Sequence, residues 1–317
     1  MAVEVARQTR VVKADGLQLT WKRIHRHWQL YLVIAVPLAF LITFNYVPML
    51  GAQIAFRDYN PIQGMWHSPW TGFSEFSDFF KSPYFWPLIR NTLTLGIYTL
   101  VISTPAAVIL ALALNEVRNE RFKRIVQMFT YAPYFISTVV LVGIMQIILS
   151  PSTGLLGQLA HLFGANPPNV LGNPTAFPSV YVWSGIWQET GYGAVIYLAA
   201  LSNVNPELYE AARIDGASRF QKMLHIDVQS IKPTMIILVI LAVGNVLRVG
   251  FEKVYLLQNN LNLSTSEIIS TYVYKMGLLN ANFSFAGAVG LFDAIVGLIL
   301  IFAVNLIARR VSDTSLF

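Results

Sequence analysis

One segment of the chain, residues 203–233, is polar and carries residues suited to binding another protein. Its centre reads Glu-Ala-Ala-Arg-Ile-Asp-Gly-Ala over 210–217. Asn205 is a good N-cap and Pro206 fits the first helical position, so a helix is expected to begin there. Gly216 can end that helix in the left-handed conformation. The segment therefore predicts two short helices joined by a glycine hinge, which together form a compact knob.

The predicted knob has side chains that suit a docking surface. Its alanines let another backbone approach closely, and Met223 and Leu224 supply apolar contacts. The candidate docking residues are Glu210, Ala211, Ala212, Asp215, Gly216, Ala217 and Ile226. A solvated helical hairpin that only links its neighbours fits the helix signals equally well. The helix signals alone leave both interpretations open.

Ionisable and aromatic side chains inside the apolar segments form a second group. A charge inside a membrane is costly, so such residues are functional candidates. Trp183 and Trp187 are four residues apart and can line one face of a helix. The candidate residues of a polar path are Trp183, Trp187, Glu189, Tyr192, Asn245, Arg248 and Asp293. The alternative is structural, with Glu189 or Asp293 paired with Arg248.

The chain lacks the signatures of several kinds of active site. No glycine is followed by lysine, so the phosphate-binding loop of nucleotide hydrolases is missing. His-Glu-x-x-His and Gly-x-Ser-x-Gly motifs are missing too, and the lack of cysteine excludes thiolate metal sites. His25 and His27 lie in a basic leader and are read as interfacial charge. We predict no catalytic residue, no metal site and no bound cofactor.

The elements that position these residues are membrane spans. The chain is 55% hydrophobic and 12% charged, against about 25% charged in ordinary soluble domains. Several apolar segments reach the roughly 20 residues that cross a bilayer. The spans are expected at about 30–50, 90–114, 127–149, 179–202, 234–250 and 287–308. The predicted fold is an all-α polytopic membrane protein with about six transmembrane helices.

The distribution of basic residues predicts the orientation of the chain. If both termini are cytoplasmic, most of the 22 Lys and Arg residues lie on the cytoplasmic side. The net charge of +6 is therefore read as topology and not as nucleic-acid binding. We expect a cytoplasmic basic segment at 1–29, a membrane domain at 30–310 and a cytoplasmic tail at 311–317. The first apolar stretch is too long for a signal-peptide core, so it is predicted to be an uncleaved anchor.

The segment at 210–217, with Ile226 and Pro233, resembles the Glu-Ala-Ala cytoplasmic loop in the permease subunits of bacterial ABC importers. The family usually has Leu-Pro shortly after the isoleucine, whereas Val228 and Gln229 stand at those positions here. The second half of the loop is therefore expected to enter the membrane with less of a break.

Other motifs resemble the oligosaccharide and polysaccharide branch of these importers. They are Pro69-Trp-Thr-Gly72, Pro83-Tyr-Phe-Trp86, Arg90-Asn-Thr92, Leu114-Asn115-Glu116, Tyr131-Ala-Pro133 and Gly250-Phe-Glu-Lys-Val-Tyr255. The resemblance covers most of residues 30–310. Outside these motifs, a short helix is expected at about 265–277, with Glu267 in its first turn.

The resemblance implies the type I importer fold and a non-catalytic permease subunit in the bacterial inner membrane. It implies a second related permease, an external solute-binding protein, and two ATPase subunits that bind ATP and Mg and dock at 205–228. The chain would form half of the path for an oligosaccharide, with the aromatic residues of 183–192 stacking on sugar rings. Acidic, alginate-like chains are one possibility. Six basic residues on the outward side could meet them, namely Arg57, Lys81, Arg90, Arg248, Lys253 and Lys275.

Two other kinds of protein compete with this interpretation. A secondary transporter driven by an ion gradient would be expected to show paired internal repeats, and none is visible here. A membrane-embedded enzyme could use Glu189 and Asp293 as its carboxylates, but no histidine cluster or metal-ligand spacing accompanies them. Both alternatives leave the segment at 203–233 unexplained.

Overall fold

The structure is a computed structural model that describes residues 28–247 and 249–311, with side chains up to residue 306. The chain divides into two compact units, residues 1–53 and 54–317. Helix runs without a break from Trp28 to Phe56. Its parts are α2 (Trp28–Leu41), a π-turn (Ile42–Tyr46), α3 (Val47–Met49) and a 3-10 turn (Leu50–Phe56). Arg248 and most of 1–29 lie outside the described residues.

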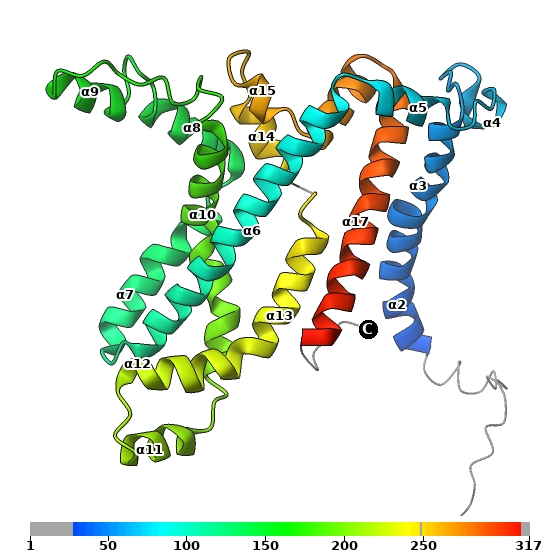
Figure 1. The fold of residues 1–317 in the computed structure, drawn as a ribbon. Helices are drawn as coiled ribbons and strands as arrows, with labels where there is room; N and C mark the ends of the chain where they lie inside the picture. The colour runs from blue at the N-terminus through cyan, green and yellow to red at the C-terminus, as the bar shows by residue number, and fades with distance from the viewer. Residues whose placement is uncertain (1–27, 248, 312–317) are drawn as a thin grey trace, which may run out of the picture. The chain divides into compact units, whose positions relative to one another are not determined.

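The second unit is built on four long helices. They are α6 (Phe85–Glu116), α10 (Phe177–Leu201), α13 (Val228–Gly244) and α17 (Phe283–Val311). Helix α6 packs along α10 (Figure 1) through small side chains such as Ala107, Ala111 and Ala194, which allow close approach.

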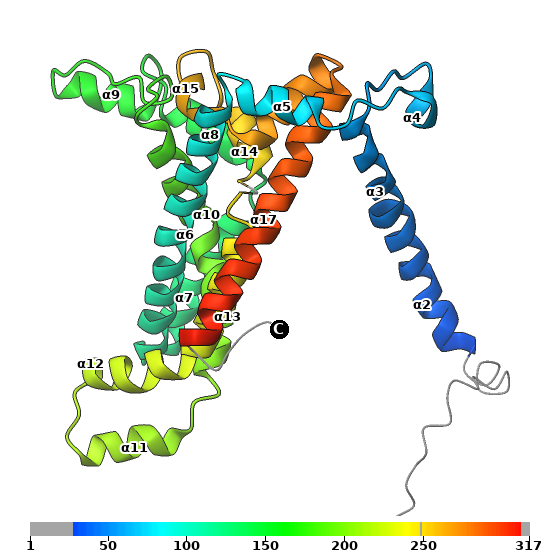
Figure 2. The same cartoon turned by 45° about the vertical axis from the view of Figure 1, so that its right-hand side comes forward.

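The other described helices of this unit are shorter. They are α4 (Gly64–His67), α5 (Ser74–Lys81), α7 (Glu120–Tyr131), α8 (Thr138–Ile148), α9 (Leu155–Leu162), α11 (Pro206–Ile214), α12 (Arg219–Lys222), α14 (Phe251–Leu257), α15 (Leu263–Ser266) and α16 (Ile269–Tyr274). Helices α11 and α12 lie at one end in both views, and α5, α9 and α15 lie at the other (Figures 1 and 2). We call the first the knob end and the second the opposite end.

The prediction of an all-α polytopic membrane protein is confirmed. Among the described residues, four helical segments are long and apolar enough to cross a membrane: Trp28–Phe56, Phe85–Glu116, Arg219–Gly244 and Phe283–Leu306. Helix α10 has 25 residues, which is long enough to cross as well, but it is not among these most apolar helices. The remaining predicted span, 127–149, needs correction.

The segment predicted as a straight span at 127–149 is a broken pair of helices. Helices α7 and α8 are bent by 100° at a short break that contains a 3-10 turn, Ala132–Phe135. Pro133 lies in this turn, and the Ser137 side chain caps α8 by accepting a hydrogen bond from the backbone N–H of Val140. The break lies inside an apolar run, so hydropathy does not reveal it.

The span predicted at 234–250 begins earlier and ends earlier. Helix continues from α12 through a π-turn, Met223–Asp227, into α13, which ends at Gly244. Pro233 lies inside α13. The expectation of a weaker break at Val228 and Gln229 is therefore confirmed.

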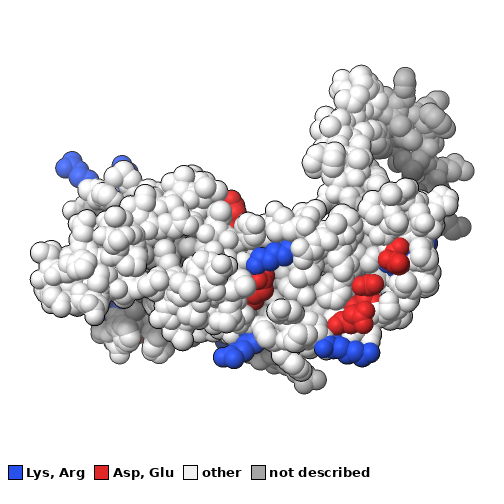
Figure 3. Space-filling view, turned by 90° about the horizontal axis from the view of Figure 1, so that it is seen from above, with Lys and Arg blue, Asp and Glu red and all other residues white. Residues whose placement is uncertain are grey.

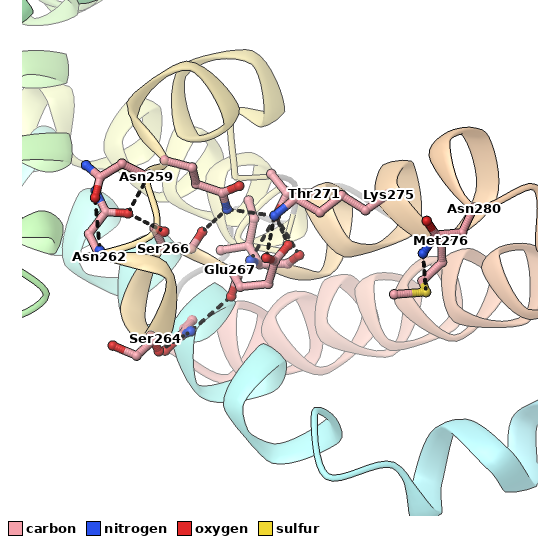
Figure 4. Close-up of polar contacts among 12 residues, drawn as sticks. Asn259, Asn262, Ser264, Ser266, Glu267, Thr271, Lys275, Met276 and Asn280 are labelled. Atoms are coloured by element: carbon pink, nitrogen blue, oxygen red, sulfur yellow. Dashed lines mark hydrogen bonds and ion pairs between the residues drawn. The ribbon is translucent and has the colours of Figure 1, made fainter. Parts of the chain in front are cut away.

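Polar side chains fix the opposite end of the unit to the start of α6. The predicted helix at 265–277 is in fact α15, α16 and a π-turn, Lys275–Leu279. Glu267 lies in the break, where its carboxylate pairs with Lys275 at 2.6 Å (Figure 4). The Asn91 amide donates to the backbone oxygens of Ser264 and Glu267, both at 3.0 Å. The Arg90-Asn-Thr92 motif therefore holds a joint between α6 and this connection.

Candidate functional site

The first part of the knob, which we define as residues 203–222, has the local structure that the sequence predicts, whereas the second predicted short helix continues through a π-turn into α13. The Asn205 side chain accepts a hydrogen bond from the backbone N–H of Glu207 at 3.0 Å, which caps α11. Gly216 has a φ of +74°, and the N–H of Ala217 donates to the oxygen of Ala212 at 2.9 Å. This is the Schellman arrangement for ending a helix. A capping box between Ser218 and Gln221 then begins α12.

The knob exposes apolar side chains away from the bundle. Ile214 is 87% exposed and Phe220 is 66% exposed, and they flank the hinge at Gly216. The sequence interpretation missed both and favoured Met223 and Leu224. Met223 instead packs on the core between α6, α10 and α13.

The candidate docking residues differ in exposure. Glu210, Ala211, Asp215 and Gly216 are exposed, whereas Ala212, Ala217 and Ile226 are half-buried. Ile214 lies two residues before the predicted hinge at Gly216. That position in the sequence is the signal from which its exposure could be predicted.

A buried hydrogen bond joins the knob to the bundle. The Tyr209 hydroxyl of α11 donates to Oδ1 of Asp227, which is fully buried. Burial, followed by the hydrogen bond and the charge of Asp227, raises the pKa of Tyr209 well above its usual range, so the phenol keeps its proton. Asn115 and Glu116, at the end of α6, also influence this pKa. The Leu114-Asn115-Glu116 motif therefore ends beside the base of the knob.

Two adjoining cavities, of about 290 and 330 Å³, lie between α6, α10, α13 and the segment that leads into α14. The residues that line both are Thr99, Ser103, Tyr181, Glu189 and Ala242. Lys253 lines the first cavity and Asn245 the second. The candidates Glu189 and Asn245 thus come together, although 56 positions separate them in the chain.

The tryptophans of α10 do not face these cavities. At about 100° of rotation per residue, Trp183 and Trp187 lie roughly 120° and 160° around the helix from Glu189. Both are more than half exposed, and Nε1 of Trp183 donates to the Tyr98 hydroxyl at 3.2 Å. They form a second surface of α10, separate from the polar cavities.

The remaining path candidates occupy other places. The ring of Tyr192 stacks on Tyr134 at 4.0 Å, next to the break between α7 and α8. Asp293 of α17 lines a different cavity of about 190 Å³, together with Gly244 and Asn245. Arg248 lies outside the described residues, so its predicted pairing is untested. Within the described ranges, no group of three His, Cys, Asp or Glu side chains is placed to hold a metal ion.

Comparisons with known proteins identify the family of this chain. Residues 103–313 match the model of the binding-protein-dependent transport system inner membrane component. The chain belongs to this family. It is 43% identical over 307 residues to Protein LplB of Bacillus subtilis, with 96% of each chain covered. It is 42% identical over 288 residues to the polygalacturonan/rhamnogalacturonan transport system permease protein YteP of the same organism, covering 91% of this chain and 90% of that protein.

Solved structures agree with the sequence relatives. A chain of a bacterial ABC transporter involved in the import of the acidic polysaccharide alginate superposes with a TM-score of 0.86 and 37% identity, covering 92% of this chain and 99% of that one. A second structure, with the same score and identity, is in complex with an alginate pentasaccharide-bound periplasmic protein. The prediction of an ABC importer permease subunit with this fold is confirmed. The family is one of transport membrane components, so the chain is a membrane subunit and not a catalytic one.

Proposed function

We propose that this chain forms half of the path through which an ATP-driven importer takes up oligosaccharides that carry carboxylates. The observation that supports this most is the pair of relatives that handle acidic polysaccharides, the polygalacturonan/rhamnogalacturonan permease and the alginate importer chain. Both are similar over more than 90% of this chain. A second, related permease would supply the other half of the path.

An external solute-binding protein would deliver the sugar to the opposite end of the unit. Seen from that end, most of the surface is neither acidic nor basic, and the charged side chains gather in a few places (Figure 3). Charge complementarity mainly raises association rates and excludes wrong partners. We therefore expect shape and hydrogen bonding to decide most of this contact.

The knob would receive an ATPase subunit that binds ATP and Mg. Ile214 and Phe220 offer an apolar contact, and such exposed apolar groups mark interaction sites when they cluster. Glu210, Ala211, Asp215 and Gly216 border this contact. The Tyr209–Asp227 bond gives the ATPase a rigid connection to the bundle.

The knob end would face the cytoplasm. Helix α17 runs from the opposite end to the knob end (Figures 1 and 2), so this helix ends on the side of the knob. Arg213, Arg219 and Lys222 add basic charge there, as the positive-inside rule expects. With the first helix crossing once, the N-terminal segment would also be cytoplasmic.

Replacing both exposed apolar residues of the knob tests the docking role. In the assembled importer, the double variant Ile214→Ser and Phe220→Ser should lose at least tenfold in ATPase affinity, because the apolar contact is removed. Co-purification of the ATPase and saccharide-stimulated ATP hydrolysis measure the effect. The matched control is Leu162→Ser with Phe163→Ser, which removes two equally exposed apolar side chains at the opposite end. Equal ATPase retention in the two double variants would refute docking at the knob.

A further inference from the structure

Lys253 is a buried lysine that forms no ion pair with a carboxylate of the described residues. Its side chain belongs to α14, and the residue is only 8% exposed. Its Nζ donates to the backbone oxygen of Tyr181 at 2.9 Å and lies 4.8 Å from the centre of the Tyr181 ring. The one ion pair within 4.0 Å that the described residues show joins Lys275 to Glu267. The hydrogen bond and the ring contact of Lys253 are therefore with neutral groups, and the anionic charge that acts on it is that of Glu189.

A charge in such a place is costly unless an anion neutralises it. Burial of an ammonium without a paired charge costs several kcal/mol, on the order of the penalties measured for broken buried ion pairs. Glu189 lines the same cavity but lies farther than 4.0 Å from the ammonium. The Nζ packs closely on Gly185, where a Cβ would lie only 3.2 Å from it. Lys253 thus stands in the wall of the first cavity, where a ligand could reach it.

The rest of the cavity suits a sugar. The hydroxyl oxygens of Thr99 and Thr190 are buried and have no hydrogen-bond partner in the described part of the chain. Buried polar groups normally have a partner, so these two hydroxyls, on residues that line the cavity, would gain one if small side-chain movements brought them to a sugar hydroxyl or a water. Tyr181 and Tyr197 are aromatic residues of the same lining. Together these groups match a ring that carries several hydroxyls.

We propose that Lys253 binds the carboxylate of a uronic acid residue inside the path, which makes it the residue that selects acidic over neutral sugars. This inference rests on the proposed function as a saccharide importer. A carboxylate would form a charge-assisted hydrogen bond with Lys253. Glu189 would accept hydrogen bonds from sugar hydroxyls and repel a carboxylate that entered in the wrong orientation. Of the six basic residues predicted to face outward, Lys253 is the one among those described that lines the cavity.

The test compares two sugars of equal length that differ in charge, an oligogalacturonate and its methyl ester. Uptake of each is measured in proteoliposomes that hold the full importer, its ATPases and the binding protein. Lys253→Met should lower the ratio of acid to ester uptake by about tenfold, the equivalent of about 1.4 kcal/mol. Because the same binding protein serves every variant, its own preference cancels in this comparison. Lys253→Arg should restore most of the ratio.

Two further variants separate selection from folding. Glu189→Gln should raise the acid-to-ester ratio, because it removes the negative charge of Glu189 from the cavity. If Lys253→Met does not assemble, this variant tests the charge selection in its place. Lys81→Met, which removes an exposed lysine at the opposite end, should leave the ratio unchanged. An unchanged ratio in both cavity variants would overturn the inference while leaving saccharide import intact. Failure of the unmodified importer to take up either sugar would instead overturn the proposed function, and the inference with it.

Discussion

At the scale of single residues, Tyr209 and Asp227 are the contact that turns the knob into part of the bundle. Asp227 is fully buried, and its second oxygen, Oδ2, has no hydrogen-bond partner among the described residues. The Tyr209 hydroxyl is therefore the main hydrogen-bond donor to this carboxylate among the described residues. Movement of α11 would act directly on the turn that begins the α13 span.

Tyr209→Phe should weaken this connection. Removing the hydroxyl leaves a buried carboxylate with fewer partners, at a cost of about 1–3 kcal/mol. We expect faster hydrogen exchange in α11 and a several-fold lower ratio of sugar transported to ATP hydrolysed. Tyr255→Phe, at a partly exposed tyrosine away from the knob, is the control. If both variants retain the same transport ratio, the bond does not carry the coupling.

The roles of several residues could be predicted because these residues shape the backbone next to them in the sequence. Asn205, Pro206 and Gly216 cap, begin and end α11 as the sequence indicates. Lys253 could be predicted only as one of six basic residues on one side, since its burial depends on Tyr181, 72 positions away in the chain. Contacts of that range have no signature in the local sequence.

At the scale of elements, the break between α7 and α8 is held in place by α10. Gln188 donates to the backbone oxygen of Ile136 in the break at 2.7 Å. Gly191 brings the two backbones so close that a Cβ there would lie 1.9 Å from the oxygen of Thr130. The Tyr131-Ala-Pro133 motif thus forms a joint with α10, in the same way that Arg90-Asn-Thr92 forms one with α15 and α16.

Gly191→Ala should push α10 away from α7. Overpacking of this kind costs about 1–3 kcal/mol, and the thermal unfolding midpoint of the purified importer should fall accordingly. Gly143→Ala adds the same methyl group in α8, where nothing lies within 4 Å, and should leave the midpoint near its original value. Equal midpoints for the two variants would show that the close approach is not needed.

Elements were predictable where hydropathy is continuous and unpredictable where a tertiary contact interrupts it. The long helices α6 and α17 follow their apolar runs. The bend of 100° does not, because no charged residue stands in the break to interrupt the apolar stretch that continues into α8. The split of the expected 265–277 helix likewise depends on Asn91 and Thr92, which reach it from α6.

At the scale of the molecule, the knob and the cavities are parts of one unit. Helices α6, α10 and α13 line the cavities. The base of the knob lies beside the end of α6. A force applied to the knob therefore reaches the helices that line the cavities. Such a design works by shifting the population between two states when a ligand prefers one of them.

Sugar uptake by proteoliposomes tests this account most directly. The vesicle membrane holds this chain with its second permease and the two ATPases. ATP is enclosed inside the vesicles, and the sugar-loaded binding protein is added outside them. The account predicts that oligosaccharide uptake needs ATP hydrolysis and every partner. It also predicts that the double variant Ile214→Ser with Phe220→Ser abolishes this uptake. Uptake by this chain alone, driven by an ion gradient and indifferent to ATP, would contradict it.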